Sequence, residues 1–118
     1  MGDRMNDIFR QRLVIEGDYT QKITSDLISR FMKVLSKKLG MTIVFGPRVM
    51  RRCEKINPKH MGFEAVMVWA ESGVQLYSWE RCKFITIDIF CCHKFDIDVA
   101  SKLAAKTFGI KIMMVKEV

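Results

Sequence analysis

The sequence predicts an α+β fold: a two-layer α/β sandwich in which two helices cover one face of a mostly antiparallel sheet. Two segments with helical spacing of apolar residues, over residues 27–39 and 99–108, alternate with runs that are typical of strands. Each helical segment is followed by a glycine and a strand-like run, so the chain divides into two β-α-β halves. The 118 residues contain no linker or low-complexity segment, and we expect a single domain over residues 1–118.

The first half of the chain begins with a strand that is expected over residues 10–16 and that ends at Gly17. A helix follows. Thr24 or Ser25 is expected to cap it, because a side-chain oxygen can accept hydrogen bonds from the free N–H groups of the first turn. Gly40 lies just beyond the helix, where the left-handed conformation favours glycine. The inward face of this helix is one apolar stripe, formed by Leu27, Ile28, Phe31, Met32, Leu35 and Leu39.

A second strand is expected over residues 41–45, with its end at the Gly46-Pro47 step. The polar segment over residues 51–62 contains Pro58 and is typical of a loop. Short links separate the next three strand-like runs, so we expect them to be antiparallel neighbours. These runs cover residues 63–70, 74–79 and 84 to 91 or 92.

The chain is expected to end with a helix and a strand. Asp96 should cap this helix and Gly109 should end it, before a last strand over residues 110–115. The side chains that the helix directs inward are Val99, Leu103, Ala104 and Phe108. No apolar run reaches the roughly 18 residues that span a bilayer, so we expect no membrane partner and a cytoplasmic protein.

The composition limits the classes of partner. The net charge of +7 favours phosphate-rich partners at long range, but the cations are scattered, and most of them are expected on solvated surfaces. The four cysteines form no Cys-Xaa-Xaa-Cys pair and no export signal precedes them, so a disulfide framework is not expected. No metal is expected, because the candidate ligands match no common structural zinc pattern: Cys82, Cys92, His60 and His93.

Strand parity gives the strand over residues 84–92 two different faces. One face is apolar and suits a core beneath the helices: Ile85, Ile87, Ile89 and Cys91. The other face carries Asp88 and Cys92, and the preceding strand directs polar and aromatic side chains to the same side: Gln75, Tyr77 and Trp79. A carboxylate, a thiol, a phenol and an indole therefore meet on the sheet face without helices. The residues alone leave two interpretations open, a small-molecule site or a face buried in a dimer.

Three short motifs follow one another along the chain. They are Glu71-Ser72-Gly73, Tyr77-Ser78-Trp79 and Asp88-Ile89-Phe90-Cys91-Cys92. In order and spacing they resemble the prokaryotic type of S-adenosylmethionine decarboxylase, whose corresponding motifs are Glu-Ser-His, His-Thr-Trp and Asp-Xaa-Phe-Thr-Cys. The similarity continues through the first strand, the first helix, and the last helix and strand. It requires an insertion only in the loop over residues 51–62.

The resemblance implies a decarboxylase that processes itself. Ser72 would attack the carbonyl of Glu71, the Glu71-Ser72 bond would break, and the serine would become a pyruvoyl cofactor. Cys92 would return a proton to the substrate carbon. The implied substrate is S-adenosylmethionine or a related small molecule, and the implied product is the aminopropyl donor for spermidine biosynthesis. The family also implies a homodimer whose protomers pair through their sheets.

The sequence departs from the family pattern around the cleavage site. Tyr77 stands where the family has a histidine thought to assist elimination, and a phenol holds its proton more tightly than an imidazolium does. Gly73 replaces the histidine that follows the cleaved serine, and Glu64 replaces a serine that aids the ester step. Arg81 stands where the family has an acidic residue near the substrate ribose, although Glu80 lies beside it.

The resemblance therefore implies a set of site residues. The catalytic candidates are Ser72, Cys92 and Tyr77, and His93 could supply a base only if the strand twisted or ended at Cys92. The substrate-binding candidates are Trp79, Glu80 and Asp88.

Other interpretations remain open at this point. An unprocessed relative could keep the fold as a binding or regulatory module, and a processed one could decarboxylate another amino acid. A basic RNA-binding module would stack bases on the open sheet face, but the usual aromatic signature is absent and Asp88 would repel phosphates. A nucleic-acid partner is therefore not favoured. Its stacking residues would be Phe63, Trp69, Tyr77 and Trp79.

Overall fold

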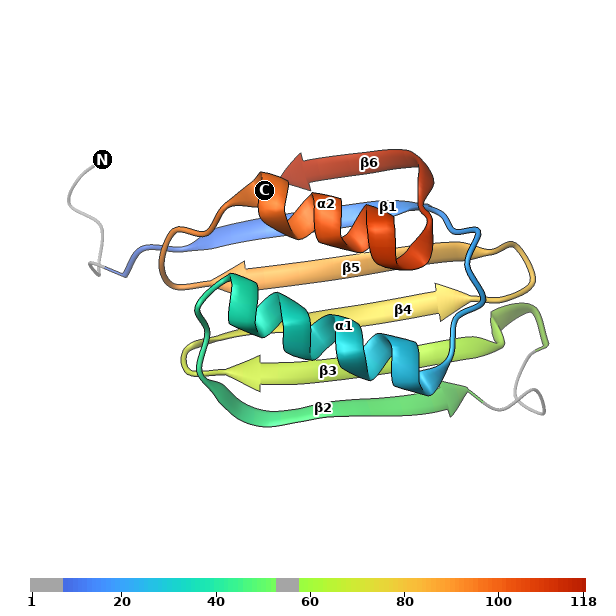
Figure 1. The fold of residues 1–118 in the computed structure, drawn as a ribbon, viewed down its shortest axis with the longest axis horizontal. Coiled ribbons are helices and arrows are strands. Elements are labelled where there is room, and N and C mark those ends of the chain that lie inside the picture. Colours follow the sequence, from blue (N-terminus) through green and yellow to red (C-terminus); the bar gives the residue numbers. More distant parts are fainter. Residues whose placement is uncertain (1–7, 53–57) are drawn as a thin grey trace.

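The computed structural model describes residues 8–52 and 58–118. Six strands form one sheet in the order β2-β3-β4-β5-β1-β6, and every neighbouring pair is antiparallel. Both helices cover the same face of this sheet (Figure 1), which confirms the predicted α+β sandwich. In chain order the elements are β1 (Gln11–Asp18), α1 (Ser25–Lys38), β2 (Ile43–Arg52), the 3₁₀ turn η1 (Pro58–His60), β3 (Gly62–Trp69), β4 (Ser72–Trp79), β5 (Phe84–Cys91), α2 (Ile97–Phe108) and β6 (Lys111–Glu117).

Each helix joins two strands that run parallel but are not neighbours in the sheet. Helix α1 leads from β1 to β2 at one edge, and α2 leads from β5 to β6 at the other edge. Three hairpin links join β2, β3, β4 and β5 between these two units. This arrangement gives the two predicted β-α-β halves and directs both helices to one side.

The helix boundaries follow the capping residues. The hydroxyl of Thr24 accepts a hydrogen bond from the backbone N–H of Leu27 at 3.1 Å, so Thr24 rather than Ser25 is the N-cap of α1. The carboxylate of Asp96 accepts two such bonds at the start of α2, and Gly109 ends that helix in the left-handed conformation with φ 62°. Neither helix in the described residues is long and apolar enough to cross a membrane.

The helices and the sheet enclose an apolar core, and a polar network lies within it beneath α1. Phe31 of α1 and Phe108 of α2 meet edge to face, with ring centroids 4.9 Å apart. Beneath α1, the indole N–H of Trp69 donates to Ser36 Oγ at 2.7 Å, and Ser36 donates to the carbonyl of Met32 at 2.7 Å. The inward residues of β5 are buried as strand parity predicts: Ile85, Ile87, Ile89 and Cys91.

Strand β2 differs from the prediction. The predicted end at Gly46-Pro47 is wrong, because β2 continues through this step to Arg52. The register against β3 shifts on both sides of Phe45, so an irregular segment accommodates the proline. A residue without a backbone N–H is tolerated here because β2 lies at the edge of the sheet. The predicted loop therefore begins after Arg52, and part of it, residues 53–57, lies outside the described residues.

Two of the four aromatic side chains that an RNA-binding sheet would use face the wrong way. Trp69 is 0% exposed and Phe63 is 9% exposed, because both belong to the buried face of β3. Neither ring can stack on a base. That part of the RNA interpretation is wrong.

We expect Ser36→Ala to lower the free energy of unfolding by about 1 kcal/mol, because the buried Trp69 indole would lose its oxygen acceptor and keep only the weaker sulfur acceptor of Met67. Ser101→Ala is the matched control, since the Ser101 hydroxyl bonds only to carbonyls of its own helix. Urea denaturation should show a clearly smaller loss for the control. Equal losses would mean that the indole does not depend on Ser36.

Candidate active site

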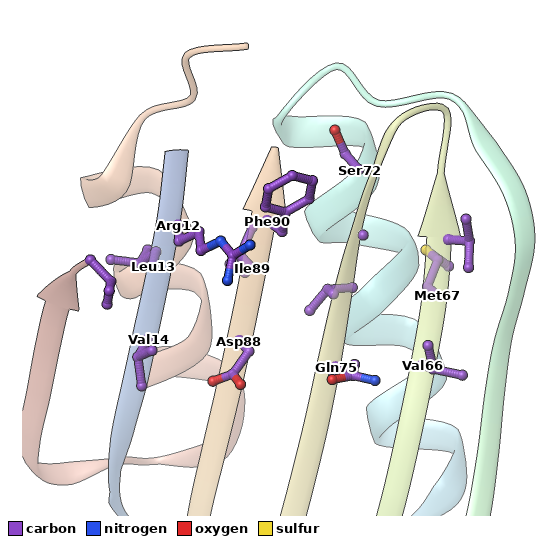
Figure 2. A pocket seen from close by; sticks show the side chains of 14 residues that line it. Arg12, Leu13, Val14, Val66, Met67, Ser72, Gln75, Asp88, Ile89 and Phe90 are labelled. Carbon is purple, nitrogen blue, oxygen red and sulfur yellow. The ribbon is translucent and has the colours of Figure 1, made fainter. Parts of the chain in front are cut away.

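A hollow of about 470 Å³ lies on the sheet face that the helices leave open (Figure 2). Residues of β1, β3, β4 and β5 line it, and its volume falls in the range of small-molecule sites. Its walls are partly apolar, with Val14, Val66 and Phe90 among them. The polar residues that line it are Arg12, Ser72, Gln75 and Asp88.

Ser72 is the first residue of β4 and is 8% exposed. The antiparallel pairing of Gly73 with Phe90 puts Ser72 beside Cys91, the last residue of β5. The backbone N–H of Cys92 donates to Ser72 Oγ at 3.2 Å. The serine oxygen is therefore held where β5 ends and the hollow begins.

The residue before Ser72 has a strained backbone. Glu71 has a φ of 59°, in the left-handed region, and this conformation costs a non-glycine residue roughly 1–2 kcal/mol. Only Ala70 and Glu71 connect the paired residues Trp69 and Ser72, so a tight turn imposes the conformation. The peptide bond that the sequence predicts to break thus follows a strained residue.

The two neighbouring cysteines have different environments. Cys91 is fully buried, and its side chain shares a hydrogen bond with Ser72. Burial raises the pKa of the Cys91 thiol to about 11, against a smaller lowering by the Ser72 hydrogen bond, so the thiol is neutral at pH 7. Cys92 follows the last residue of β5 and is partly exposed. The side chain of Cys91 and the main chain of Cys92 both contact Ser72.

Asp88 and Arg12 give the hollow one acidic and one basic group. Asp88 lies opposite Gln75 on the neighbouring strand and stays open to solvent from the hollow. Partial burial raises the pKa of Asp88, and the negative charge of Glu16 raises it further. The Arg12 guanidinium lies 5.0 Å from the centroid of the Phe90 ring (Figure 2). Opposite charges in one hollow suit a zwitterionic ligand such as an amino acid.

The aromatic candidates lie at the far end of β4. Tyr77 follows Ser72 by five positions along an extended strand, which separates the two residues by about 17 Å. The rings of Tyr77 and Trp79 stack with centroids 6.4 Å apart, and the Trp79 indole donates to Nδ1 of His60 at 3.3 Å. Within one chain, the structure does not bring Tyr77 or Trp79 to Ser72.

Two arginines at the end of β2 contact two of the substrate-binding candidates, Glu80 and Trp79. Glu80 forms a salt bridge with Arg51, and the hydrogen bond from Arg51 holds the pKa of Glu80 below its usual value. The guanidinium of Arg52 lies 5.3 Å from the centroid of the Trp79 ring and donates to the carbonyl of Phe63 at 2.9 Å. At this end of the open face, ionic, cation–π and hydrogen-bond contacts therefore hold the side chains together.

The candidate metal ligands are dispersed. Among the described residues, no group of three or more potential ligands could hold a metal ion. Cys82 precedes β5 and Cys92 follows it, so the whole strand separates them. His93 is exposed, and its Nδ1 lies 3.3 Å from the carbonyl oxygen of Lys94.

Sequence reasoning does not identify two residues of this site. Arg12 reaches the hollow because β1 pairs with β5, which puts Arg12 opposite Phe90. Alternation along the first strand would have placed Arg12 on the open face, but only the strand order brings it to the hollow. Cys91 is predicted as a core residue, and it is one, but the same burial also places its thiol against Ser72.

Comparisons with known proteins cover most of the chain. The family model described as S-adenosylmethionine decarboxylase matches residues 18–118. The fold is similar to the crystal structure of the adenosylmethionine decarboxylase from Aquifex aeolicus VF5, with a TM-score of 0.72 and 13% sequence identity. That alignment covers 96% of this chain and 91% of the other. No curated protein matches the sequence.

We expect Glu16→Gln to lower the pKa of Asp88, because the Glu16 charge raises it. The pKa should stay above the ordinary value of 3.8, because partial burial is the larger cause. Carboxyl ¹³C NMR titration would measure both effects, with Glu64→Gln as a control that should leave Asp88 unchanged. A rise in the Asp88 pKa after Glu16→Gln would contradict this electrostatic account.

Proposed function

The chain belongs to the S-adenosylmethionine decarboxylase family, and we propose that it is a pyruvoyl-dependent decarboxylase that cleaves itself between Glu71 and Ser72. The observation that carries this proposal is the position of Ser72. Its hydroxyl oxygen accepts a hydrogen bond from the Cys92 N–H, the preceding residue is strained, and Ser72 lines the hollow. A serine in this position can attack the preceding carbonyl and still face a ligand site afterwards.

Self-cleavage would begin with a bond between Ser72 Oγ and the carbonyl carbon of Glu71. The C–N bond breaks, the nitrogen takes up a proton, and an ester joins the two residues. The ester path is longer than the amide it replaces, so it relieves the tight turn at Glu71. A base then removes the α-proton of residue 72 while the Glu71 carboxylate leaves. Hydrolysis with loss of ammonia gives the pyruvoyl group at the head of the second fragment.

A base for the elimination is not supplied by the thiol that contacts Ser72. The pKa of Cys91 is about 11, so this thiol holds its proton at neutral pH. Tyr77 corresponds to the family's processing histidine, but it lies about 17 Å along the same strand. We therefore propose that a second protomer supplies the residues at the far end of β4, and that the active form is a homodimer.

The open sheet face is suited to such pairing. It carries exposed apolar side chains on β2, β3 and β6, namely Met50, Val68 and Met114, which are 45%, 40% and 43% exposed. Exposed apolar residues that share one face are typical of an interface. A second copy turned end for end over this face would bring Tyr77 and Trp79 of the partner subunit toward Ser72.

The surroundings of Ser72 fit a pyruvoyl group. A Cβ on Gly73 would lie 3.0 Å from the Met67 carbonyl oxygen, so a larger residue after the cofactor would require a small shift of β3. When formed, the pyruvoyl ketone withdraws electrons from the substrate carbon as carbon dioxide leaves. Cys92 directly follows β5, at the end where Ser72 lies, and it would protonate the substrate carbon that has lost carbon dioxide.

The charges of the hollow support S-adenosylmethionine, or a related amino acid, as the substrate. Asp88 would attract its sulfonium group, and Arg12 would attract its carboxylate. Glu80 is engaged by Arg51, so a ribose contact through Glu80 would require that salt bridge to open. The product would serve spermidine biosynthesis in the cytoplasm.

One observation favours a second candidate function. The described groups that contact Ser72 are a neutral thiol and a backbone N–H, and neither is a base. A chain that never cleaves would keep the hollow as a binding site for an amino acid or a nucleoside. In that case the protein would act as a binding or regulatory module.

We expect intact-mass spectrometry to show two fragments, residues 1–71 and 72–118. The second fragment should be lighter, by one ammonia, than simple hydrolysis would give. Ser72→Ala should remain a single chain of 13.7 kDa, whereas Ser25→Ala, at the exposed start of α1, should still cleave. A single intact chain in the wild-type dimer would support the binding module instead.

We expect cleavage to be shared between protomers. Tyr77→Phe homodimers should cleave slowly, because the partner phenol is lost. Co-expression with Ser72→Ala chains should restore cleavage of the Tyr77→Phe chain, since each mixed dimer holds one intact Tyr77 facing one intact Ser72. Mass spectrometry distinguishes the two chains. Full-rate cleavage by Tyr77→Phe alone would exclude Tyr77 from the reaction.

A further inference from the structure

The seam between α1 and α2 forms a groove on the side of the protein away from the open sheet face. The two helices lie side by side and run in opposite directions (Figure 1). Two hollows of about 310 and 320 Å³ lie along the seam and share Leu103 and Lys106. Together they form one continuous depression, which we call the interhelical groove.

The rim of the interhelical groove is basic. Within residues 8–52 and 58–118, none of its cations forms a salt bridge, and no acidic residue lines the groove. The acidic residues of the two helices, Asp26 and Asp98, lie in the first turns, four residues before Arg30 and Lys102, and within the described residues they form no salt bridge with them. The rim cations come from segments far apart in the sequence, and all four are exposed: Arg30 and Lys38 of α1, and Lys102 and Lys106 of α2.

The floor of the groove is apolar. Leu27 and Val34 of α1 face Val99 and Leu103 of α2 along the seam, and all four are partly exposed. Like charges on adjacent turns destabilise an isolated helix, and Lys106 has Lys102 rather than an acidic residue one turn before it, so Lys106 gains most from an external anion. An apolar floor between basic rims favours a ligand with an apolar stripe and acidic flanks.

We propose that the interhelical groove binds an acidic amphipathic helix of a partner protein. A helix laid on a seam between two helices buries its apolar stripe on the floor and directs acidic side chains to both rims. Arg30 and Lys38 are eight residues apart on α1, or about 12 Å along the axis. Acidic residues at positions i, i+4 and i+8 of a partner helix span the same length.

A nucleic acid fits this groove less well. The floor offers no exposed aromatic ring for base stacking, since Phe31 is buried beneath the seam. Partly exposed leucine and valine side chains gain nothing from a phosphate backbone. The combination of apolar and basic groups therefore favours the helix.

The experiment uses the full-length protein and fluorescein-labelled synthetic peptides of about 18 residues, long enough to form helix. The test peptide has leucines at i, i+3, i+4 and i+7 with flanking glutamates, and a second peptide has serines in place of the leucines. Fluorescence anisotropy should show binding of the first peptide and at least about tenfold weaker binding of the second. The double variant Lys102→Glu/Lys106→Glu should also weaken the first peptide at least about tenfold, because two attractions become repulsions.

The matched control is Lys83→Glu/Lys116→Glu, which makes the same change in net charge at exposed residues outside the groove. It should alter peptide affinity by less than about twofold, and circular dichroism should show that both variants fold. Equal weakening by both variants would overturn the proposal, because binding would then follow net charge alone. Absence of peptide binding, or tighter binding of labelled oligouridine than of the peptide, would overturn it as well. None of these results depends on cleavage at Ser72.

Discussion

The antiparallel pairing of β4 with β5 is the constraint on which the candidate site depends. This register puts Ser72 at the end of β5, where the main chain of Cys92 and the side chain of Cys91 reach its hydroxyl. The same register turns the isoleucines of β5 toward the helices. A slip of one residue would exchange the two faces of the strand and expose the core. The burial that stabilises the sheet therefore also fixes the geometry around Ser72.

Because both helices cover the same face of the sheet, the two faces have different roles. Both helices pack on one side, where Phe31 meets Phe108 and the Trp69 indole is satisfied by Ser36. The other side keeps a hollow with polar walls and exposed apolar residues around it. A ligand site and a subunit interface can therefore share that side. The outer surface of the helices stays available for a different partner.

The chemistry proposed for this fold is distributed along one extended strand. Strain at Glu71 and two hydrogen-bonding groups at Ser72 would favour the proposed attack at the turn, but the neutral Cys91 thiol supplies no base. An extended strand cannot fold back on itself, so Tyr77 stays far from Ser72 in the same chain. Catalysis by this protein would thus require the homodimer. An unprocessed protein that acts as a binding module would not require it.

The sequence by itself determined most of the elements, the cap at Asp96 and the two faces of β5, because periodicity and capping are local properties. It narrowed the first cap to Thr24 or Ser25, and the structure decided for Thr24. It also identified the family, because short motifs around Ser72 and Cys92 keep their order. It could not show that β2 passes through Gly46-Pro47, since only an edge position in the sheet makes that proline tolerable. Tertiary structure alone decided that Arg12 joins the hollow, that Cys91 contacts Ser72, and that scattered cations of two helices meet along one seam. Each of these depends on which strands and helices become neighbours, and that is set by burial of the whole core rather than by any local pattern.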